Sequence, residues 1–387
     1  MDAYIVEAVR TAGGKRKGRL AEHHPADLGA IVIDALIERS GIDPAAVEDV
    51  LFGCVTKAGE QAFAIGRSAV LASRRLPDSV PSVTIDRQCG SSQQAVQFAA
   101  QAVLSGTQDV LIAGGVESMT RVPMGSDFTL HASAGLGTGP WSAAILEKYG
   151  VTQFSQFVGA QKVADRYQLS RRAMDEFALE SHRRAAAAIE AGAFAREIMP
   201  VPTLAGIHAQ DEGVRFDASL EAMAALEPLQ AGGAITAANA SQMCDGAAAM
   251  LVVNEAGLRR HGLKPLARIR GFAVSAGDPV TMLAEPIEAT RQALRRVGMR
   301  LQDIDLFEVN EAFASVPLAW LKALDADPAR LNVNGGAIAL GHPLGASGVK
   351  LMTTLVHALK ARGLRYGLQA MCEGGGMANV TILEAID

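Results

Sequence analysis

The chain carries the run Asp109-Val110-Leu111-Ile112-Ala113-Gly114-Gly115, which is typical of a strand buried on both faces of a sheet. Two shorter strand-like runs precede it, at residues 50–53 and 83–85. An Ala-rich segment, residues 90–104, lies before the run and has the composition of a helix. This alternation predicts β-α-β units and an α/β fold class.

The same pattern returns in the last third of the chain. Residues 303–309 resemble residues 47–53, residues 341–359 repeat the glycine turn and helix of residues 89–104, and residues 368–375 resemble residues 110–115. An internal duplication into two βαβ halves is the simplest explanation. Cys89 and His342 would then occupy equivalent turns, and both turns would meet at the sheet ends, where ligands bind in open α/β sheets.

Composition limits the class of protein. The chain has 387 residues, 49% of them hydrophobic, and a net charge of −5, which suits a globular protein of two or three domains. We expect a cytoplasmic protein, because no secretory signal and no apolar stretch of roughly 20 residues is present. The acidic balance disfavours a nucleic-acid partner, and the basic cluster at residues 15–19 suits a solvated loop or a subunit contact.

The chain has four cysteines, Cys54, Cys89, Cys244 and Cys372, too few for a disulfide framework and without the spacing of metal ligands. The eight histidines are scattered, so no metal site is predicted. Cys54 and Cys244 are interpreted as small buried hydrophobic residues. Cys89 and Cys372 are different, because glycine follows each closely and would let backbone amides approach a reacting carbonyl.

Residues 118–243 differ from the two halves. Gly- and Ser-rich loops at residues 125–139 are followed by charged helical sequence, and residues 171–191 have the charge spacing of a helix with a solvated face. We interpret this region as an inserted loop domain. The predicted domains are residues 1–117 plus 244–264, the insertion at 118–243, and residues 265–387.

Four separated motifs resemble the signatures of the thiolases, the acetyl-CoA acyltransferases. They are Gln88-Cys89-Gly90-Ser91-Ser92, Asn310-Glu311-Ala312-Phe313, the segment 335–345 around Gly341-His342-Pro343, and Cys372-Glu373-Gly374-Gly375-Gly376. Residues 9–15 and 239–248 resemble the family too, so the match extends over nearly the whole chain. The resemblance implies a thiolase fold, with a layered α-β-α-β-α core and the loop domain, and an acyltransferase.

The chemistry of these residues agrees with acyl transfer. Cys89 precedes a predicted helix whose N-terminus would favour the thiolate, and His342 from the other half can accept its proton. Cys372 is the candidate acid/base for a second proton transfer, as the resemblance also implies.

The resemblance further assigns two oxyanion pockets. One would use His342 with a water held by Asn310, and the other the N–H groups of Cys89 and Gly374. Asn310 could instead cap the following turn. Glu311 suits a structural carboxylate better than a base.

Coenzyme A is the implied co-substrate, and no permanently bound cofactor is expected. By position, the resemblance assigns Ser241 and Ala237 to the pantetheine arm, Arg215 to the adenine end, and Ala312 and Phe313 to the substrate channel. Core packing is an equal alternative for Phe313, and a solvated loop position is an alternative for Arg215. The family also implies a homodimer or homotetramer, with residues 59–67 and 83–86 as a plausible contact.

Two departures from short-chain thiolases bear on the substrate. Phe154-Ser155-Gln156-Phe157-Val158-Gly159 replaces a His-Met-Gly segment, and Ala222 replaces a serine. We therefore predict a degradative 3-ketoacyl-CoA thiolase, acting on fatty-acyl or steroid-derived chains in β-oxidation. A biosynthetic acetoacetyl-CoA thiolase and a catalytically silent acyl-CoA or lipid carrier are the alternatives. Decarboxylating ketosynthases and hydroxymethylglutaryl-CoA synthase are related rivals, and Cys372 argues against the ketosynthases.

Overall fold

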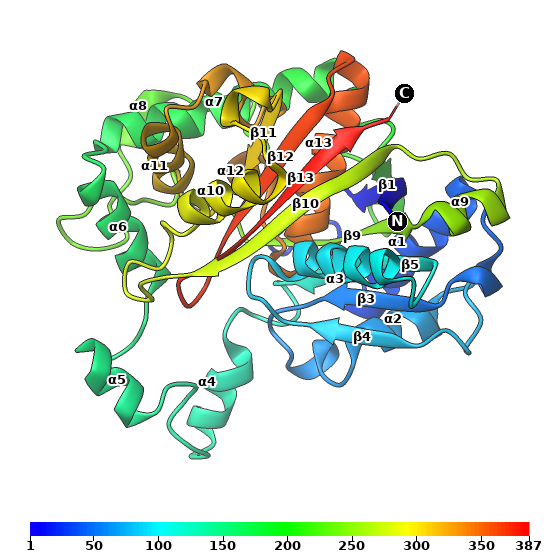
Figure 1. Ribbon diagram of the computed structural model, residues 1–387. Helices are drawn as coiled ribbons and strands as arrows, with labels where there is room; N and C mark the ends of the chain where they lie inside the picture. Colours follow the sequence, from blue (N-terminus) through cyan, green and yellow to red (C-terminus); the bar gives the residue numbers. More distant parts are fainter. Residues whose placement is uncertain (387) are drawn as a thin grey trace.

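The computed structural model describes residues 1–386, and its strands form two half-sheets of matching topology (Figure 1). The first half-sheet has the spatial order β1-β9-β5-β3-β4. Its strands are β1 (Ala3–Thr11), β3 (Asp49–Gly53), β4 (Ser82–Ile85), β5 (Val110–Ser118) and β9 (Cys244–Val253). The strand β3 is parallel to both β4 and β5, whereas β9 is antiparallel to β5 and β1.

The second half-sheet repeats this order as β10-β13-β12-β11. Its strands are β10 (Ala267–Ala276), β11 (Leu306–Val309), β12 (Tyr366–Glu373) and β13 (Met377–Ala385). A parallel bridge between Phe307 and Leu331 stands where β4 lies in the first half. The predicted duplication is thereby confirmed, since both halves place a parallel strand pair beside two antiparallel strands. Three residue pairs between β1 and β10 join the halves.

Helices complete a five-layer arrangement. The helices of the core are α1 (Pro25–Ser40), α2 (Ile65–Ala72), α3 (Ser91–Ser105), α10 (Pro286–Val297), α11 (Ser315–Leu324) and α13 (Ser347–Arg362). One hydrophobic cluster joins α1 and α2 to the outer face of the first half-sheet, and a second joins α10 and α11 to the outer face of the other. A third cluster places α3 and α13 between the half-sheets. The predicted α-β-α-β-α core is confirmed (Figure 1).

Small residues allow the two central helices to approach closely. The buried side of α3 carries Ala95, Ala99 and Ala100, at the spacing of one helical face. On α13, a Cβ atom at Gly348 would lie 2.3 Å from the backbone nitrogen of Gln93. The N-terminal ends of α3 and α13, which follow Cys89 and His342, therefore meet in the middle of the molecule.

The insertion between β5 and β9 contains more helix than its composition predicts. Its elements are α4 (Ser126–Ser133), α5 (Ala143–Tyr149), α6 (Gln156–Arg166), α7 (Arg171–Glu190), α8 (Leu220–Ala224), β6 (Ile198–Met199), β7 (Val201–Thr203) and β8 (Gly206–His208). The helix expected at residues 171–191 is confirmed as α7. The expected loop at residues 125–139 is wrong in part, because α4 occupies residues 126–133. The predicted domain boundaries stay a prediction.

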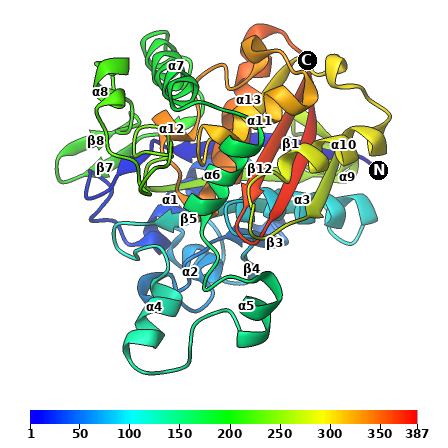
Figure 2. The ribbon, with the colours of Figure 1, turned by 90° about the vertical axis from the view of Figure 1, so that its left-hand side faces the viewer.

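The helices α4 and α5 project from the rest of the molecule in both ribbon views (Figures 1 and 2). Most of their side chains are exposed, among them Phe128 and Leu130. Aromatic contacts of Trp141 and Tyr149 with Phe154 link this arm to the start of α6. Contacts among large rings suit a segment that has little core of its own.

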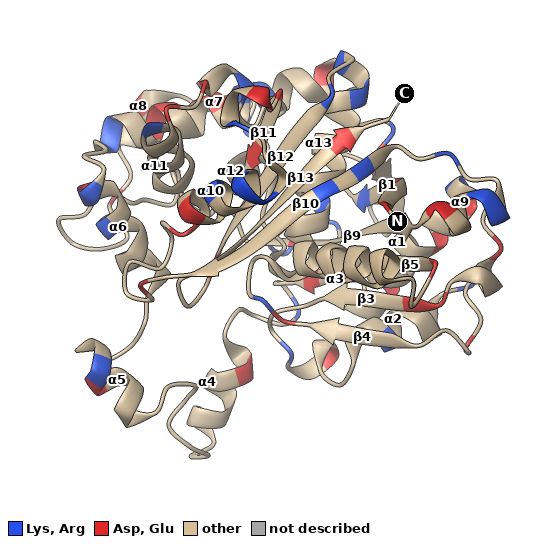
Figure 3. Cartoon of the chain, in the orientation of Figure 1, with Lys and Arg blue, Asp and Glu red and all other residues tan. Residues whose placement is uncertain are grey.

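Charged residues of both signs are interspersed over the helices and loops, and they also occur on the strands β10 and β13 (Figure 3). The remaining short elements are β2 (Gly14–Lys15), α9 (Glu255–His261) and α12 (Ala337–Leu340). Within residues 1–386, no helix is both long and apolar enough to cross a membrane.

Candidate active site

Cys89 lies between β4 and α3, in a turn with unusual backbone geometry. The preceding residue, Gln88, has a φ of 49°, a left-handed conformation that non-glycine residues seldom adopt. Such conformations persist where the surrounding structure enforces them, often at functional sites. The Cys89 side chain is half-buried and packs against Val55, Met119 and Leu344. Since Leu344 follows His342 by two residues, the Cys89 and His342 turns lie side by side.

The turn after Cys372 is in contact with the Cys89 turn. A Cβ atom at Gly374 would lie 2.8 Å from the Gln88 side-chain oxygen, and one at Gly90 would collide with the Glu373 carboxyl. Glycine at both positions leaves room for the Gln88 and Glu373 side chains at this contact. The two cysteines predicted as nucleophile and acid/base come from opposite halves of the duplication and converge here.

Both thiols are neutral in the resting protein. Burial, followed by the neighbouring Cys372 and Glu373, raises the pKa of Cys89 well above its ordinary value. Burial, then Glu373, raises the pKa of Cys372 to about 12. The N-terminus of α3 and proton acceptance by His342 were predicted to act together, and desolvation opposes the contribution of the helix. Cys89 therefore needs a proton acceptor.

His342 is buried and suited to accept a proton. Its Nδ1 lies 2.5 Å from the Ser347 hydroxyl, which donates to the Pro343 carbonyl at 2.8 Å. Because the Ser347 hydroxyl donates its proton to the Pro343 carbonyl, its oxygen must accept from Nδ1. The ring proton of the neutral imidazole is therefore assigned to Nδ1, and Nε2 has a free lone pair. The Asn310 amide, 3.4 Å from Nε2, can donate to the same lone pair. Burial, then the charge of Lys350, lowers the pKa of His342 to about 3, so the ring is a neutral base.

Glu117 fixes the His342 turn to the Cys89 side of the site. This buried carboxylate accepts hydrogen bonds from the backbone N–H groups of Val55, Thr56 and Gly345, at 2.9, 3.0 and 2.8 Å. Sequence analysis did not identify Glu117. Its place at the carboxyl end of a predicted buried strand was the available signal, because ligand-side residues gather there.

Asn310 and Glu311, neighbours in one motif, have different surroundings. The Asn310 amide faces His342. Its interaction with Cys372 opposes the rise of the Cys372 pKa. Asn310 does not cap α11, whose N-cap residue is Ala314. Glu311 accepts hydrogen bonds from Ser181 at 2.7 Å, Asn332 at 2.8 Å and the Ile338 N–H at 3.1 Å. A carboxylate with three internal donors is a structural group, as predicted.

An open cavity of about 200 Å³ lies between α7, α8 and the segment 237–242. Arg215 and Ala237, both predicted to contact coenzyme A, line it, and so does Ala222. A second hollow of about 220 Å³ shares Arg215 and His182 with the first. Burial, then the charge of Arg215, lowers the pKa of His182 to about 4. Sequence analysis missed His182, which lies in the helix predicted at residues 171–191 to have a solvated face.

Three further predicted binding residues lie beside the cavity. The Ser241 N–H donates to the Ala312 carbonyl at 2.9 Å, which pairs the two segments. Phe313 is a buried core residue whose ring meets that of Phe157 edge-on at 5.7 Å. The structure therefore favours the packing interpretation of Phe313 over a channel wall. Among residues 1–386, no group of three or more His, Cys, Asp or Glu side chains is arranged to hold a metal ion.

Comparison with known proteins identifies the family. Residues 3–256 match the thiolase N-terminal domain, and residues 263–385 match the thiolase C-terminal domain. The chain therefore belongs to the thiolase family and is an acyltransferase.

Individual relatives agree with this assignment. The chain is 53% identical to the steroid 3-ketoacyl-CoA thiolase FadA6 of Mycobacterium tuberculosis, over all of this chain and 94% of that protein. It is 42% identical to a probable acetyl-CoA acetyltransferase of Escherichia coli and 39% identical to a 3-ketoacyl-CoA thiolase of Bacillus subtilis, in each case over 99% of both chains. The thiolase resemblance and the predicted fold class are confirmed.

Proposed function

We propose that this thiolase is a degradative enzyme that cleaves a 3-ketoacyl-CoA with coenzyme A, giving acetyl-CoA and a shortened acyl-CoA. The observation that carries the proposal is the convergence of Cys89 and Cys372, two neutral thiols from opposite halves, beside the neutral base His342. Thiolysis needs a nucleophile and a separate acid/base, and two thiols with a base between the halves can supply both.

The first half-reaction breaks the carbon-carbon bond. His342 accepts the Cys89 proton as the sulfur attacks the 3-keto carbonyl, and the bond between the α and β carbons breaks. The electron pair of that bond leaves on the α carbon as the enolate of acetyl-CoA. Cys372 donates its proton to this carbon, acetyl-CoA departs, and the acyl group stays on Cys89.

The second half-reaction returns the acyl group to coenzyme A. The Cys372 thiolate takes the proton of the incoming thiol, whose sulfur attacks the acyl-Cys89 carbonyl. The Cys89 sulfur leaves and recovers its proton from His342. All protons are balanced, and the kinetics are ping-pong.

Two groups of donors are proposed to stabilise the negative oxygens. His342, once protonated at Nε2, would donate with a water held by Asn310 to the enolate oxygen. The N–H groups of Cys89 and Gly374 would donate to the tetrahedral intermediate. The contact between the Gly374 turn and the Cys89 turn supports this second pair.

Coenzyme A is proposed to lie along the cavity, with Arg215 towards the adenine end and Ala237 and Ser241 along the pantetheine arm. The proposed contact of Arg215 with coenzyme A is supported by its exposed side chain, which lines both hollows. The pairing of Ser241 with Ala312 connects this segment to the Asn310 motif, so a pantetheine arm following it would lead to Cys89.

Mass spectrometry after incubation with acetyl-CoA tests the nucleophile directly. We expect one acetyl group on Cys89 and none in Cys89→Ala. A folded wild-type protein that takes up no acetyl group would support the silent carrier instead. Turnover of a malonyl thioester would support a ketosynthase.

The preferred acyl chain is proposed to be larger than acetoacetyl. The segment 154–159, and Ala222 in the cavity wall, distinguish this chain from the short-chain pattern. A steroid-derived or long fatty-acyl substrate fits the name of the 53% identical relative. The test is kcat/KM across 3-ketoacyl-CoAs of increasing size, and preference for acetoacetyl-CoA would contradict the proposal. A cytoplasmic location and a homodimer or homotetramer remain predictions.

A further inference from the structure

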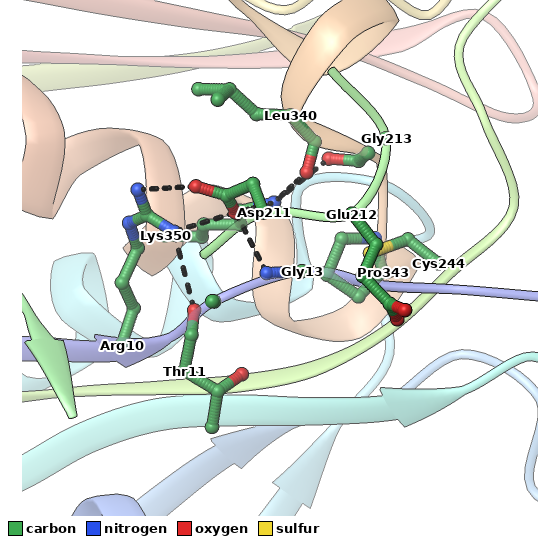
Figure 4. A network of polar contacts seen from close by, with 12 residues as sticks. Arg10, Thr11, Gly13, Asp211, Glu212, Gly213, Cys244, Leu340, Pro343 and Lys350 are labelled. Carbon is green, nitrogen blue, oxygen red and sulfur yellow. Dashed lines mark hydrogen bonds and ion pairs between the residues drawn. The ribbon is translucent and has the colours of Figure 1, made fainter. Parts of the chain in front are cut away.

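A buried cluster of four charged side chains lies behind the His342 turn. Arg10 donates to Glu197 at 2.6 Å and to both carboxylate oxygens of Asp211, at 2.8 and 3.1 Å. Lys350 of α13 lies 3.7 Å from Asp211. Figure 4 shows Arg10 and Lys350 converging on Asp211, which also accepts the Gly13 N–H at 2.7 Å. The two cations and two anions balance, as buried charges require.

Lys350 connects this cluster to the backbone just before His342. Its ammonium group donates to the Leu340 carbonyl and, at 3.1 Å, to the Gly341 carbonyl. Asp211, which Lys350 also contacts, begins the loop 211–215 that carries Arg215 into the cavity. Burial raises the pKa of Asp211, but Arg10 and Lys350 outweigh burial and keep it below its ordinary value. The carboxylate is therefore charged and holds the loop to Lys350.

A second connection runs through Gln242 on the opposite side of the loop. Its side-chain amide donates to the Gly213 carbonyl at 2.8 Å and to the Ile338 carbonyl at 2.7 Å. The backbone carbonyl of Gln242 accepts a hydrogen bond from the backbone N–H of His342 at 3.0 Å. Gln242 also lines the cavity and follows Ser241. One residue therefore contacts the loop 211–215, the segment before His342, and His342 itself.

We propose that Gln242 and Lys350 are positioning residues that couple occupation of the nucleotide end of the cavity to the placement of the His342 ring. The inference rests on the proposed function of the site. Contacts of a coenzyme A nucleotide with the loop 211–215 act on His342 through two braces, the Gln242 amide and the Asp211–Lys350 pair. Neither residue touches the reacting atoms.

The physical basis is the sensitivity of proton transfer to distance. A displacement of about 1 Å far from the chemistry can cost roughly a hundredfold in rate. The Gln242 brace consists of half-buried hydrogen bonds. The other brace consists of the buried Asp211–Lys350 ion pair and the hydrogen bonds of Lys350 to the carbonyls of residues 340 and 341. An ordered loop 211–215 would then hold His342 where it can accept the Cys89 proton.

The test compares two acetyl donors in single-turnover acetylation of Cys89, followed by quenching and mass spectrometry. Acetyl-CoA carries the nucleotide, whereas S-acetyl-N-acetylcysteamine lacks it and most of the pantetheine arm. At saturating donor, we expect Gln242→Met to lower the rate constant with acetyl-CoA by about tenfold or more and the rate constant with the short donor by less than about twofold. Lys350→Met should show the same pattern.

The matched controls are Gln302→Met and Lys360→Met, which make the same changes at exposed positions outside both braces. Both should acetylate at wild-type rates with either donor. Equal losses with the two donors in Gln242→Met would overturn the proposal, because they would indicate local support of the fold alone. Unchanged rates would overturn it too. Wild-type protein acetylated by neither donor would instead overturn the proposed function, and this inference with it.

Discussion

Cys89 and His342 are both uncharged at rest, so the first proton transfer and the nucleophilic attack belong to one event. A thiolate-imidazolium pair would need the pKa of Cys89 below that of His342, and burial moves the two values in opposite directions. Burial thus favours the protonated form of Cys89, the proposed nucleophile, before a substrate binds. The placement of His342 then matters more than its charge.

The pH dependence of acetylation follows from this arrangement. His342 is a base only when neutral, and its pKa of about 3 keeps it neutral throughout the acidic range in which the protein can be assayed. The rate of Cys89 acetylation by acetyl-CoA should therefore change little between pH 7.5 and 5.5. A histidine with the ordinary pKa would lose about tenfold over that interval. Quenched-flow mass spectrometry checks this, and an acid limb near pH 6.5 would contradict it.

Replacement of Cys372 separates the two proposed thiol roles. Cys372→Ala should keep acetylation of Cys89 by acetyl-CoA within about tenfold of wild type while lowering thiolysis of a 3-ketoacyl-CoA by about a hundredfold or more. The reason is that cleavage of the carbon-carbon bond needs a positioned acid to protonate the α carbon, whereas the coenzyme A thiolate released during acetylation is a better leaving group and can depart with less help from Cys372. His342→Ala should reduce both reactions. Equal loss of both in a folded Cys372→Ala protein would show that the assignment is wrong.

At the scale of elements, the crossing of α3 and α13 determines where the two reactive turns meet. A Cβ atom at Gly348 would lie 2.3 Å from the Gln93 nitrogen, and one at Gly53 would lie 2.6 Å from the Gly345 carbonyl oxygen. The Val349 N–H donates to the Ser92 hydroxyl at 3.0 Å across the same contact. Glycine and small side chains thus allow two helices to begin within hydrogen-bond distance of each other.

Substitution of Gly348 should damage this crossing. Gly348→Ala forces the helices apart, and we expect a loss of about 1–3 kcal/mol of unfolding free energy, the usual cost of overpacking. Thermal or urea unfolding measures it. Ala361→Ser, a small change on the exposed side of α13, is the control and should stay within about 0.5 kcal/mol of wild type. A fully stable Gly348→Ala would mean that the helices can separate without cost.

At the scale of the whole molecule, the proposed catalytic residues come from both duplicated halves. The first half contains Cys89, and the second contains Asn310, His342 and Cys372. The insertion adds the cavity beside them, with His182 on α7 in its wall. A site assembled from three regions depends on the whole fold, and it also gathers buried ionisable groups from all of them.

His182 makes stability depend on pH. Its pKa is about 4 in the folded protein and about 6.5 when unfolded, so the unfolded chain binds more protons as pH falls below 6.5. The stability that this group contributes is complete above pH 6.5 and decreases towards pH 4. From pH 7 to pH 5, the unfolding free energy of the wild type should fall by about 2 kcal/mol more than that of His182→Gln. Urea unfolding at both pH values checks this, and parallel losses would contradict it.

The sequence determined the class of fold and the repeat, and it named the residues that we propose to be reactive. Hydrophobic runs such as that of β5 and the alternation of strand and helix are local patterns, so they are visible without coordinates. The motifs around Cys89, Asn310, His342 and Cys372 are local as well. That is why the four proposed catalytic side chains could be named before their distances were known.

Only the tertiary structure decided how these side chains are held and charged. The neutral state of Cys89 depends on burial by residues distant in sequence, and the contacts of Glu117, Gln242 and Lys350 join segments separated by up to 228 residues along the chain. Desolvation and long-range hydrogen bonds are properties of packing, which no local pattern encodes. For the same reason the structure placed Phe313 in the core and brought His182 into the cavity.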